Sequence, residues 1–208
     1  VMAIRLEVSL NSRIPDVRGR DAAGRARRFL HAPVSSCRTR AVYLVDMPLS
    51  PSEVARVRRA FADPVTARAA VGRLPPPRFD WLVEVGFRFG VTNNLGHTAR
   101  EAIADVLDRA PGPREGVYTA TQYFLRGQKL ARADAERIGR DLLANELIQT
   151  CRVFSPAEWA AEPLNTEPPV IRETVEPQAR PVDLGGPDEE LLRISRDGVL
   201  SLDLGEMK

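Results

Sequence analysis

The sequence has few of the residues on which catalysis, metal binding and disulfide bonding depend. Its 208 residues include two cysteines and two histidines, and aromatic residues make up only 6%. Cys37 and Cys151 lie far apart without metal-ligand spacing, so reduced thiols in a cytosolic protein are the simplest interpretation. No run of about 18 apolar residues could span a bilayer, and no basic segment precedes a long apolar run at the N-terminus. We therefore expect a cytoplasmic protein without membrane contact.

Motifs for phosphate chemistry and for nucleophilic catalysis are also absent. No GxxxxGK[ST] stretch occurs, and no GxGxxG stretch opens a helix. Neither cysteine has a local motif that pairs it with a base. The "GGPDEE" stretch at residues 185–190 offers carboxylates, but the acidic first turn of a helix is a better interpretation than a metal site. The sequence thus predicts no catalytic residue, no metal site and no cofactor site.

The small net charge of +2 hides an uneven distribution along the chain. Residues 155–208 carry 12 acidic and 5 basic residues, which leaves 16 acidic and 25 basic residues in the first 154 positions. The basic part permits an anionic partner, but nucleic-acid binding also needs a groove or stacking aromatics. We therefore expect no nucleic-acid partner, and keep a nucleic-acid-binding module only as the second alternative.

The chain repeats itself after 77 residues. Near the start, apolar residues alternate with polar ones, as in a strand with one buried face, at Ile4, Leu6, Val8 and Leu10. Adding 77 to these numbers gives Trp81, Val83, Val85 and Phe87. At the same offset Asp16 corresponds to Asn93, and both side chains can accept hydrogen bonds from free amides at a helix start. We expect each half to open with a strand followed by a helix.

The rest of each half repeats with slightly larger offsets. A second strand is predicted at residues 38–46 and 117–125, rich in β-branched and aromatic residues. A second helix follows, starting with a capping box at Ser50 in the first half. Short apolar strands around 69–71 and 150–154 end the halves, which residues 72–78 join.

The fold class predicted from this repeat is α+β. Two homologous βαβαβ modules, residues 1–74 and 75–155, form a pseudo-dimer of antiparallel sheets with helices outside, each half covering the open sheet face of the other. Residues 156–208 form an extended linker, because the proline- and glutamate-rich stretch 155–187 cannot bury enough apolar area to offset its ordering entropy. Trp159 is a candidate anchor near its start.

Four residues are candidates for an interface. Glu7 and Glu84 occupy the same repeat position on the polar face of the first strands, where solvated or cross-strand-paired carboxylates are favoured over contacts with a partner. His97 lies beside a predicted helix start, where a surface or capping role is favoured over catalysis. Trp159 completes the set.

Several phrases of the repeat resemble a known family. "EVSL" with "PDVRG", its counterpart "EVGF" with "TNNLGHTA", the central "VYLVD" and "ADPV" at the end of a second helix resemble the PurS-type small subunit of phosphoribosylformylglycinamidine synthase. The tandem form resembles the N-terminal region of longer synthetase chains of that enzyme, over roughly residues 3–154. Residues 191–208 are similar to the segment that leads into the synthetase's linker domain, which implies a piece of a longer chain.

The resemblance implies a place in purine biosynthesis. The enzyme uses ATP, Mg²⁺ and glutamine to convert formylglycinamide ribonucleotide into its amidine. The resemblance implies that the PurS-like part is not the catalyst. It implies instead that this part contacts the synthetase and glutaminase parts and contributes to ammonia transfer between them. The second half has "TNN" where the first has "PDV", so the surface roles of the two halves need not match.

Two alternative hypotheses for the function stay open. A tandem small-molecule-binding regulatory module is the first alternative, although the junction "LPPPR" lacks the glycine-rich turn expected to face a ligand. Nucleic-acid binding is the second. Because fusion of two modules satisfies the interface that a free subunit would use to dimerise, we expect a monomer.

Overall fold

The computed structural model describes residues 3–169 and 182–208. The chain divides into two compact units, residues 1–171 and 172–208, which are treated separately below. Part of the stretch predicted to be extended, residues 170–181, lies outside the described residues. Among the residues that the structure does describe, no helix is long and apolar enough to cross a membrane.

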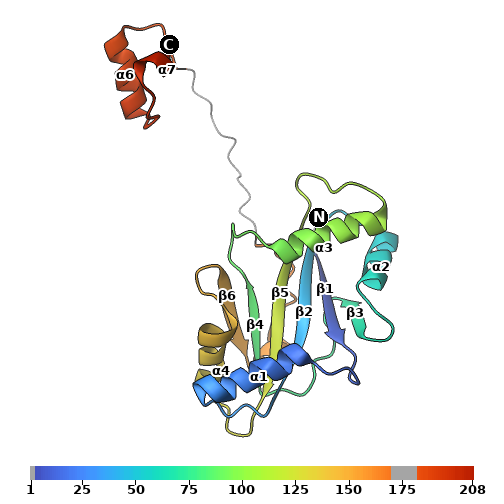
Figure 1. The fold of residues 1–208 in the computed structure, drawn as a ribbon. Coiled ribbons are helices and arrows are strands. Elements are labelled where there is room, and N and C mark those ends of the chain that lie inside the picture. The colour runs from blue at the N-terminus through green and yellow to red at the C-terminus, as the bar shows by residue number, and fades with distance from the viewer. Residues whose placement is uncertain (1–2, 170–181) are drawn as a thin grey trace. The chain divides into compact units, whose positions relative to one another are not determined.

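The first unit is built on one antiparallel sheet of six strands in the order β3-β1-β2-β5-β4-β6 (Figure 1). The strands are β1 (Ile4–Leu10), β2 (Ser36–Asp46), β3 (Ala67–Val71), β4 (Trp81–Phe87), β5 (Gly116–Arg126) and β6 (Gln149–Phe154). Together with the helices, this sheet confirms the α+β class.

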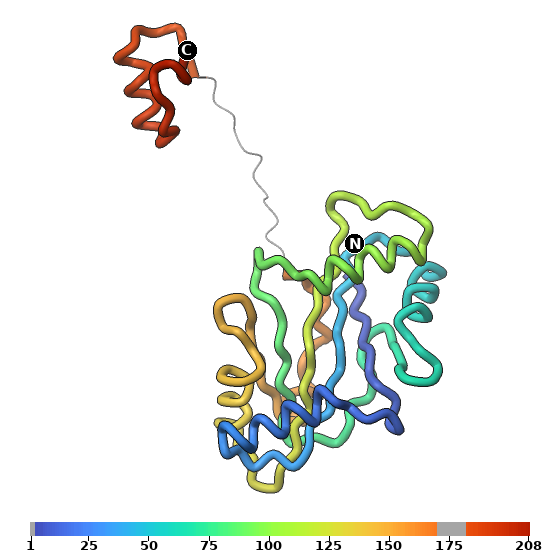
Figure 2. Tube along the Cα trace, viewed as in Figure 1, coloured from blue at the N-terminus to red at the C-terminus, as the bar shows by residue number. Residues whose placement is uncertain are grey.

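Helices cover one face of this sheet. They are α1 (Val17–Leu30), α2 (Pro51–Ala60), α3 (Asn94–Leu107) and α4 (Arg132–Ile138), the last continuing as the π-helical turn η1 (Gly139–Leu143). Figure 1 shows α1 and α3 lying across this face, which we call the front face. The chain after β6, beginning with the short helix α5 (Pro156–Ala161), runs behind the sheet in the same view (Figure 2). We call that side the back face.

The predicted order strand, helix, strand, helix, strand is confirmed in both halves. The bounds of β1 and α1 recur 77 residues later in β4 and α3, and those of β2 recur 80 residues later in β5. Both first helices end on a residue with left-handed backbone, His31 and Asp108, which are also 77 apart. The strand order β3-β1-β2 in the first half matches β6-β4-β5 in the second.

The way in which the halves meet differs from the prediction. They do not place one sheet face over another, because β2 and β5 pair edge to edge along their whole length, from Ser36 opposite Arg126 to Asp46 opposite Gly116. The expectation of separate sheets that cover each other's open face is therefore wrong. Main-chain hydrogen bonding between the two longest strands instead makes one continuous sheet.

Helices nevertheless reach across the boundary between the halves. The first core cluster combines Ala22, Ala23 and Ala26 of α1 with second-half residues such as Val83 and Ile138. The second cluster combines Ile103 and Leu107 of α3 with first-half residues such as Leu6 and Val57. Each first helix thus packs over the other half's strands and second helix, so neither half has a complete core alone.

Two glycines allow these first helices to approach the sheet. A Cβ atom added to Gly19 would lie 2.4 Å from the carbonyl oxygen of Cys37, and one added to Gly96 would lie 2.1 Å from that of Val117. Such distances are far below van der Waals contact, so only glycine fits at these two equivalent positions. The caps predicted at the same helix starts are confirmed: Asp16 accepts from the Gly19 amide at 2.7 Å, and Asn93 accepts from the Gly96 amide at 2.8 Å.

The two caps are not equally satisfied. The second carboxylate oxygen of Asp16 accepts hydrogen bonds from the backbone and the hydroxyl of Thr39. In the second half the hydroxyl of Thr119 donates to Oδ1 of Asn93 at 3.1 Å, but the buried Nδ2 of Asn93 has no hydrogen-bond partner among the described residues. Asn93→Asp is therefore expected to stabilise the fold by about 1 kcal/mol in urea unfolding, since it removes an unsatisfied donor and adds a negative charge at a helix N-terminus.

A neighbouring substitution separates these two effects. Asn94 is exposed at the first position of α3, so Asn94→Asp adds the same charge without changing the buried donor. It is expected to gain only about 0.3 kcal/mol. Equal gains from the two substitutions would show that the buried donor costs nothing.

The described part of the second unit, residues 182–208, contains two short helices, α6 (Asp188–Asp197) and α7 (Leu204–Met207). Asp188, Glu189 and Glu190 form the first turn of α6, as the acidic-turn interpretation of "GGPDEE" expects. Leu191 and Met207 are buried, and the hydroxyl of Ser195 donates to the carbonyl of Leu202 at 2.8 Å. The domain boundaries at 74/75 and 155/156 stay predictions.

Candidate functional site

Two of the sequence-predicted interface residues meet on the back face of the sheet, in a buried cluster of charged side chains. Glu7 is fully buried and accepts from three groups: the Arg5 guanidinium at 3.0 Å, that of Arg40 at 2.7 Å and the backbone amide of Leu74 at 2.8 Å. Glu84 accepts from Arg5 at 3.1 Å and from the side-chain amide of Gln122 at 2.7 Å. We call Arg5, Glu7, Arg40, Glu84 and Gln122 the back-face network.

The network joins the two halves of the chain. Arg5 on β1 contacts both Glu7 in its own half and Glu84 on β4 in the other. Arg40 and Gln122 lie directly opposite each other where β2 pairs with β5. The guanidinium of Arg40 also donates to the carbonyls of Leu74 and Pro75, each at 2.9 Å, which holds the junction between the halves against the sheet. Every strand of the central four therefore contributes a side chain.

Strand periodicity explains why these charges are buried together. On β1, Leu6 points to the front-face core, so its neighbours Arg5 and Glu7 point to the back. Burial lowers the pKa of Arg40, and the charge and hydrogen bond of Glu7 act against that shift. Isolated charges this deeply buried would cost several kcal/mol, so the fold depends on their pairing. The two glutamates are thus paired across strands, but they are not solvated.

Trp159, the third of the predicted interface residues, covers part of the back face. Its side chain is 5% exposed and packs edge to face on Phe154 at 5.4 Å between ring centres. The Arg73 guanidinium lies 4.1 Å from the Trp159 ring centre and donates to the carbonyls of Trp159 and Pro163 at 3.1 and 2.9 Å. Trp159 is therefore held in place at the start of the segment that was predicted to be an extended linker with this residue as a candidate anchor.

Trp159 lies on α5, and the start of this helix is well capped. Ser155 and Glu158 form a capping box at the start of α5, where Pro156 occupies the first helical position. Hydrogen bonds from the Ser155 backbone and from Arg132 lower the pKa of Glu158 to about 2. The start of the stretch that was predicted to be an extended linker therefore forms a helix.

His97, the fourth predicted residue, is not part of this site. It lies near the start of α3, which covers the front face, with its side chain 65% exposed and 3.7 Å from Glu101. The surface role favoured from the sequence agrees with this position.

Sequence reasoning missed three residues of the network, namely Arg5, Arg40 and Gln122. The sequence contained a signal for two of them. Arg40 is a charged residue inside the predicted strand "RTRAVYLVD", and Arg5 is two residues from Glu7 on the first predicted strand. Without the register of β2 against β5, however, nothing placed Gln122 beside either glutamate.

The network holds structure together and offers little for chemistry. All its carboxylate contacts are to cations or amides, and no cysteine, serine or histidine belongs to it. In and beside this network, the described residues include three buried polar atoms without a hydrogen-bond partner: Nε of Arg40, Nε of Arg73 and Oε1 of Gln122. None of these is a nucleophile or a general base at neutral pH. The geometry therefore fits a stabilising junction.

Neither thiol is activated. Burial, followed by the charge of Asp16, raises the pKa of Cys37 to about 12, and burial raises the pKa of Cys151 to about 11. We expect iodoacetamide at pH 8 to label both at least about 100-fold more slowly than in the urea-unfolded chain, because the thiolate is the reactive form. Labelling should accelerate with pH, at Cys151 first. Peptide mass spectrometry measures the labelling of each cysteine. Rapid labelling of Cys37 at pH 8 would contradict the expected slow reaction.

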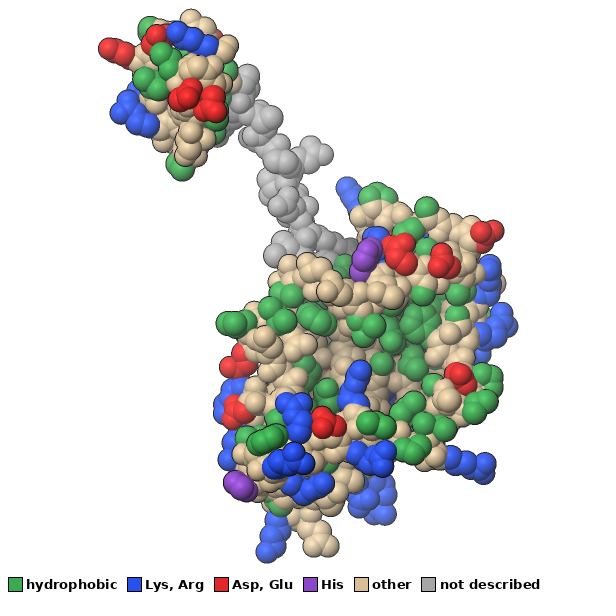
Figure 3. Space-filling model, viewed as in Figure 1, with side chains coloured by type: hydrophobic (Ala, Val, Ile, Leu, Met, Phe, Trp, Pro, Cys, Tyr) green, Lys and Arg blue, Asp and Glu red, His purple; other side chains and the backbone are tan. Residues whose placement is uncertain are grey.

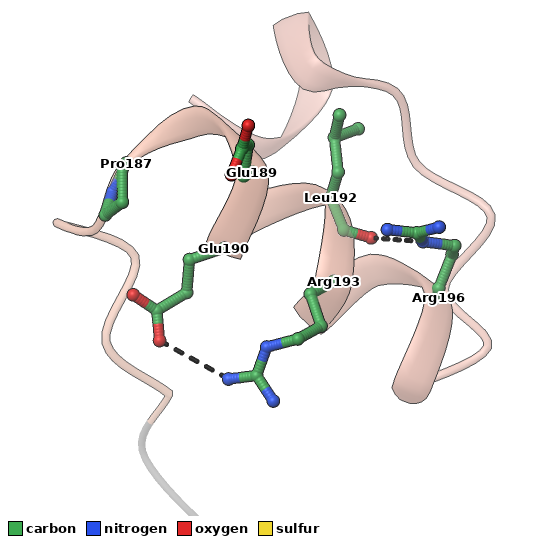
Figure 4. Close-up of a pocket in the computed structure, with 6 residues that line it drawn as sticks. All are labelled: Pro187, Glu189, Glu190, Leu192, Arg193 and Arg196. Atoms are coloured by element: carbon green, nitrogen blue, oxygen red, sulfur yellow. Dashed lines mark hydrogen bonds and ion pairs between the residues drawn. The ribbon is translucent and has the colours of Figure 1, made fainter.

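Within residues 182–208, a shallow depression lies along α6. Figure 4 shows the side chains that line it, most of them from successive turns of one helix: Pro187, Glu189, Glu190, Leu192, Arg193 and Arg196. Arg193 pairs with Glu190 at 3.4 Å, and Arg196 donates to the carbonyl of Leu192. These groups satisfy each other along the helix surface, so they do not converge on a ligand.

Across residues 3–169 and 182–208, no group of three or more metal-ligating side chains is placed to hold a metal ion. A comparison of the chain with protein-family models finds no match, and neither does a comparison with curated proteins.

Proposed function

We propose that this chain is a non-catalytic structural module of phosphoribosylformylglycinamidine synthase, which holds the synthetase and glutaminase parts in one assembly. The observation that carries the proposal is the back-face network, which ties both halves and their junction into one body, while Arg73 in that junction donates to the backbone of the outgoing segment at Trp159. A scaffold needs such rigidity, whereas an enzyme would need reactive groups at an accessible surface.

The tandem organisation supports the same proposal. The PurS-like resemblance of residues 3–154 implies two fused modules forming a pseudo-dimer, and the equivalent bounds of β1 and β4 and of α1 and α3 fit that arrangement. In this proposal ATP and Mg²⁺ bind to the synthetase, glutamine is hydrolysed by the glutaminase, and the present chain supports transfer of ammonia between them. The junction, where the regulatory alternative needs a ligand-facing turn, instead lies against Glu7 and Arg40.

Activity rescue tests this proposal. The chain is assayed alone and then mixed with a synthetase lacking its own N-terminal region and with the glutaminase, using formylglycinamide ribonucleotide, ATP and either glutamine or ammonia. We expect no turnover by the chain alone and restored glutamine-dependent turnover in the mixture. A mixture that is as inactive as its parts would remove support for the synthase assignment and leave the regulatory module to be tested.

A further inference from the structure

Helix α1 carries an unusual concentration of positive charge. Its 14 residues include five arginines and one acid, Asp21, and all five arginines are exposed: Arg18, Arg20, Arg25, Arg27 and Arg28. Only Arg25 has a carboxylate neighbour among the described residues, Asp21 at 3.8 Å. In Figure 3 the blue side chains gather over α1, whereas red ones lie over α3.

The duplicated helix α3 serves as an internal comparison. It has the same length, the same type of cap and the same buried glycine, but it contains one arginine and two acids, Glu101 and Asp105. Its residues 95, 97 and 105 correspond to Arg18, Arg20 and Arg28, and they are leucine, histidine and aspartate. Because α3 packs on the sheet without these charges, the fold does not require them on α1.

Four of the five arginines form two rows along the helix. Arg18 and Arg25 are seven residues apart, as are Arg20 and Arg27, so each pair lies on one side of α1 about 10 Å apart. Burial raises the pKa of Tyr123 on β5, and the charges of Arg18 and Arg25 act against that shift. Guanidinium groups are well suited to bind carboxylates with two parallel hydrogen bonds.

Exposed apolar residues accompany these rows. Val17 at the start of α1 is 67% exposed, and Phe29 near its end is 61% exposed. Its counterpart in α3, Val106, packs against the second core cluster. The guanidinium of Arg28 lies 5.8 Å from the Phe29 ring centre. A mixture of arginine with exposed aromatic and aliphatic residues is typical of protein interfaces.

We infer that the exposed face of α1 is a docking surface for an acidic protein segment, whose carboxylates meet the arginine rows and whose apolar side chains meet Phe29 and Val17. A single-stranded nucleic acid fits less well, since it would stack on several aromatics and α1 offers one. This inference stands independently of the synthase assignment.

Two synthetic polymers test the inference on the full chain. Fluorescent poly-glutamate reports on charge alone, and a glutamate–tyrosine copolymer adds aromatic side chains. The variant R18E/R20E/R28E is expected to bind both polymers at least about tenfold more weakly at about 100 mM salt, because three ion pairs become repulsions. Phe29→Ser is expected to weaken binding of the copolymer about threefold or more while leaving poly-glutamate within a factor of two.

A matched control carries the same change in net charge elsewhere. Arg58, Arg59 and Arg114 are exposed and have no carboxylate partner in the described part of the chain, so R58E/R59E/R114E should stay within about threefold of the unchanged protein. Equal losses in the two triple variants would overturn the inference, because the effect would then be one of net charge. A 20-nucleotide single strand that binds more tightly than the copolymer, and loses its affinity in R18E/R20E/R28E, would overturn it in favour of a nucleic-acid surface.

Discussion

Glu7→Ala is expected to lower the free energy of unfolding by about 3–5 kcal/mol, because it leaves Arg5 and Arg40 as buried cations without their shared partner. The removed carboxylate also satisfies the Leu74 amide, so the junction between the halves loses a contact. Urea unfolding followed by circular dichroism measures the effect. Glu101→Ala, at a carboxylate that is 49% exposed, is the control and should change stability by no more than about 0.5 kcal/mol.

The charge of Glu7, more than its volume, is expected to matter. Glu7→Gln keeps the size of the side chain but removes the negative charge from between two buried guanidinium groups, so it should cost nearly as much as Glu7→Ala. If Glu7→Gln were as stable as the unchanged protein to within about 1 kcal/mol, the two buried arginines would not depend on the charge of this carboxylate.

Gly96→Ala is expected to have the second large effect. The new methyl group would lie 2.1 Å from the carbonyl oxygen of Val117, and that oxygen belongs to a central strand that cannot move freely. Relief of the clash must lift α3 from β5, at a cost of about 2–3 kcal/mol. Urea unfolding again gives the free energy.

Gly24→Ala is the matched control for this substitution. Gly24 lies in the interior of α1, and a Cβ atom there would meet nothing within 4 Å. The control should stabilise the protein by about 0.5–1 kcal/mol, since alanine is the better helix former. Similar changes for the two variants would mean that α3 does not need its close approach to the sheet.

Local features of the fold could be predicted well from the sequence. Strand alternation at Ile4 and at Trp81, and helix caps at Asp16 and Asn93, depend only on neighbouring residues and on the 77-residue offset. The capping box at Ser50 is likewise a local interaction, and it is present. Such signals fixed the order of elements in each half.

Features that depend on contacts between the halves could not be predicted. β2 and β5 pair because each strand has an outer edge that is able to hydrogen bond with the other. No local residue indicates whether the halves associate edge to edge or face to face. The back-face network could not be predicted for the same reason, because the side chains that donate to Glu84 come from β1 and β5. The repeat likewise does not reveal that Phe29 lies exposed beside arginines while its counterpart Val106 packs against the core.

The mass of the assembly tests the proposed scaffold role most directly. The chain is mixed with a glutaminase and a synthetase lacking its own N-terminal region, in the presence of ATP, Mg²⁺ and glutamine, and the mixture is examined by sedimentation velocity. We expect a single species with the summed mass of all three proteins, and its absence when the present chain is omitted. A chain that sediments alone, while the other two behave identically with and without it, would contradict the proposal.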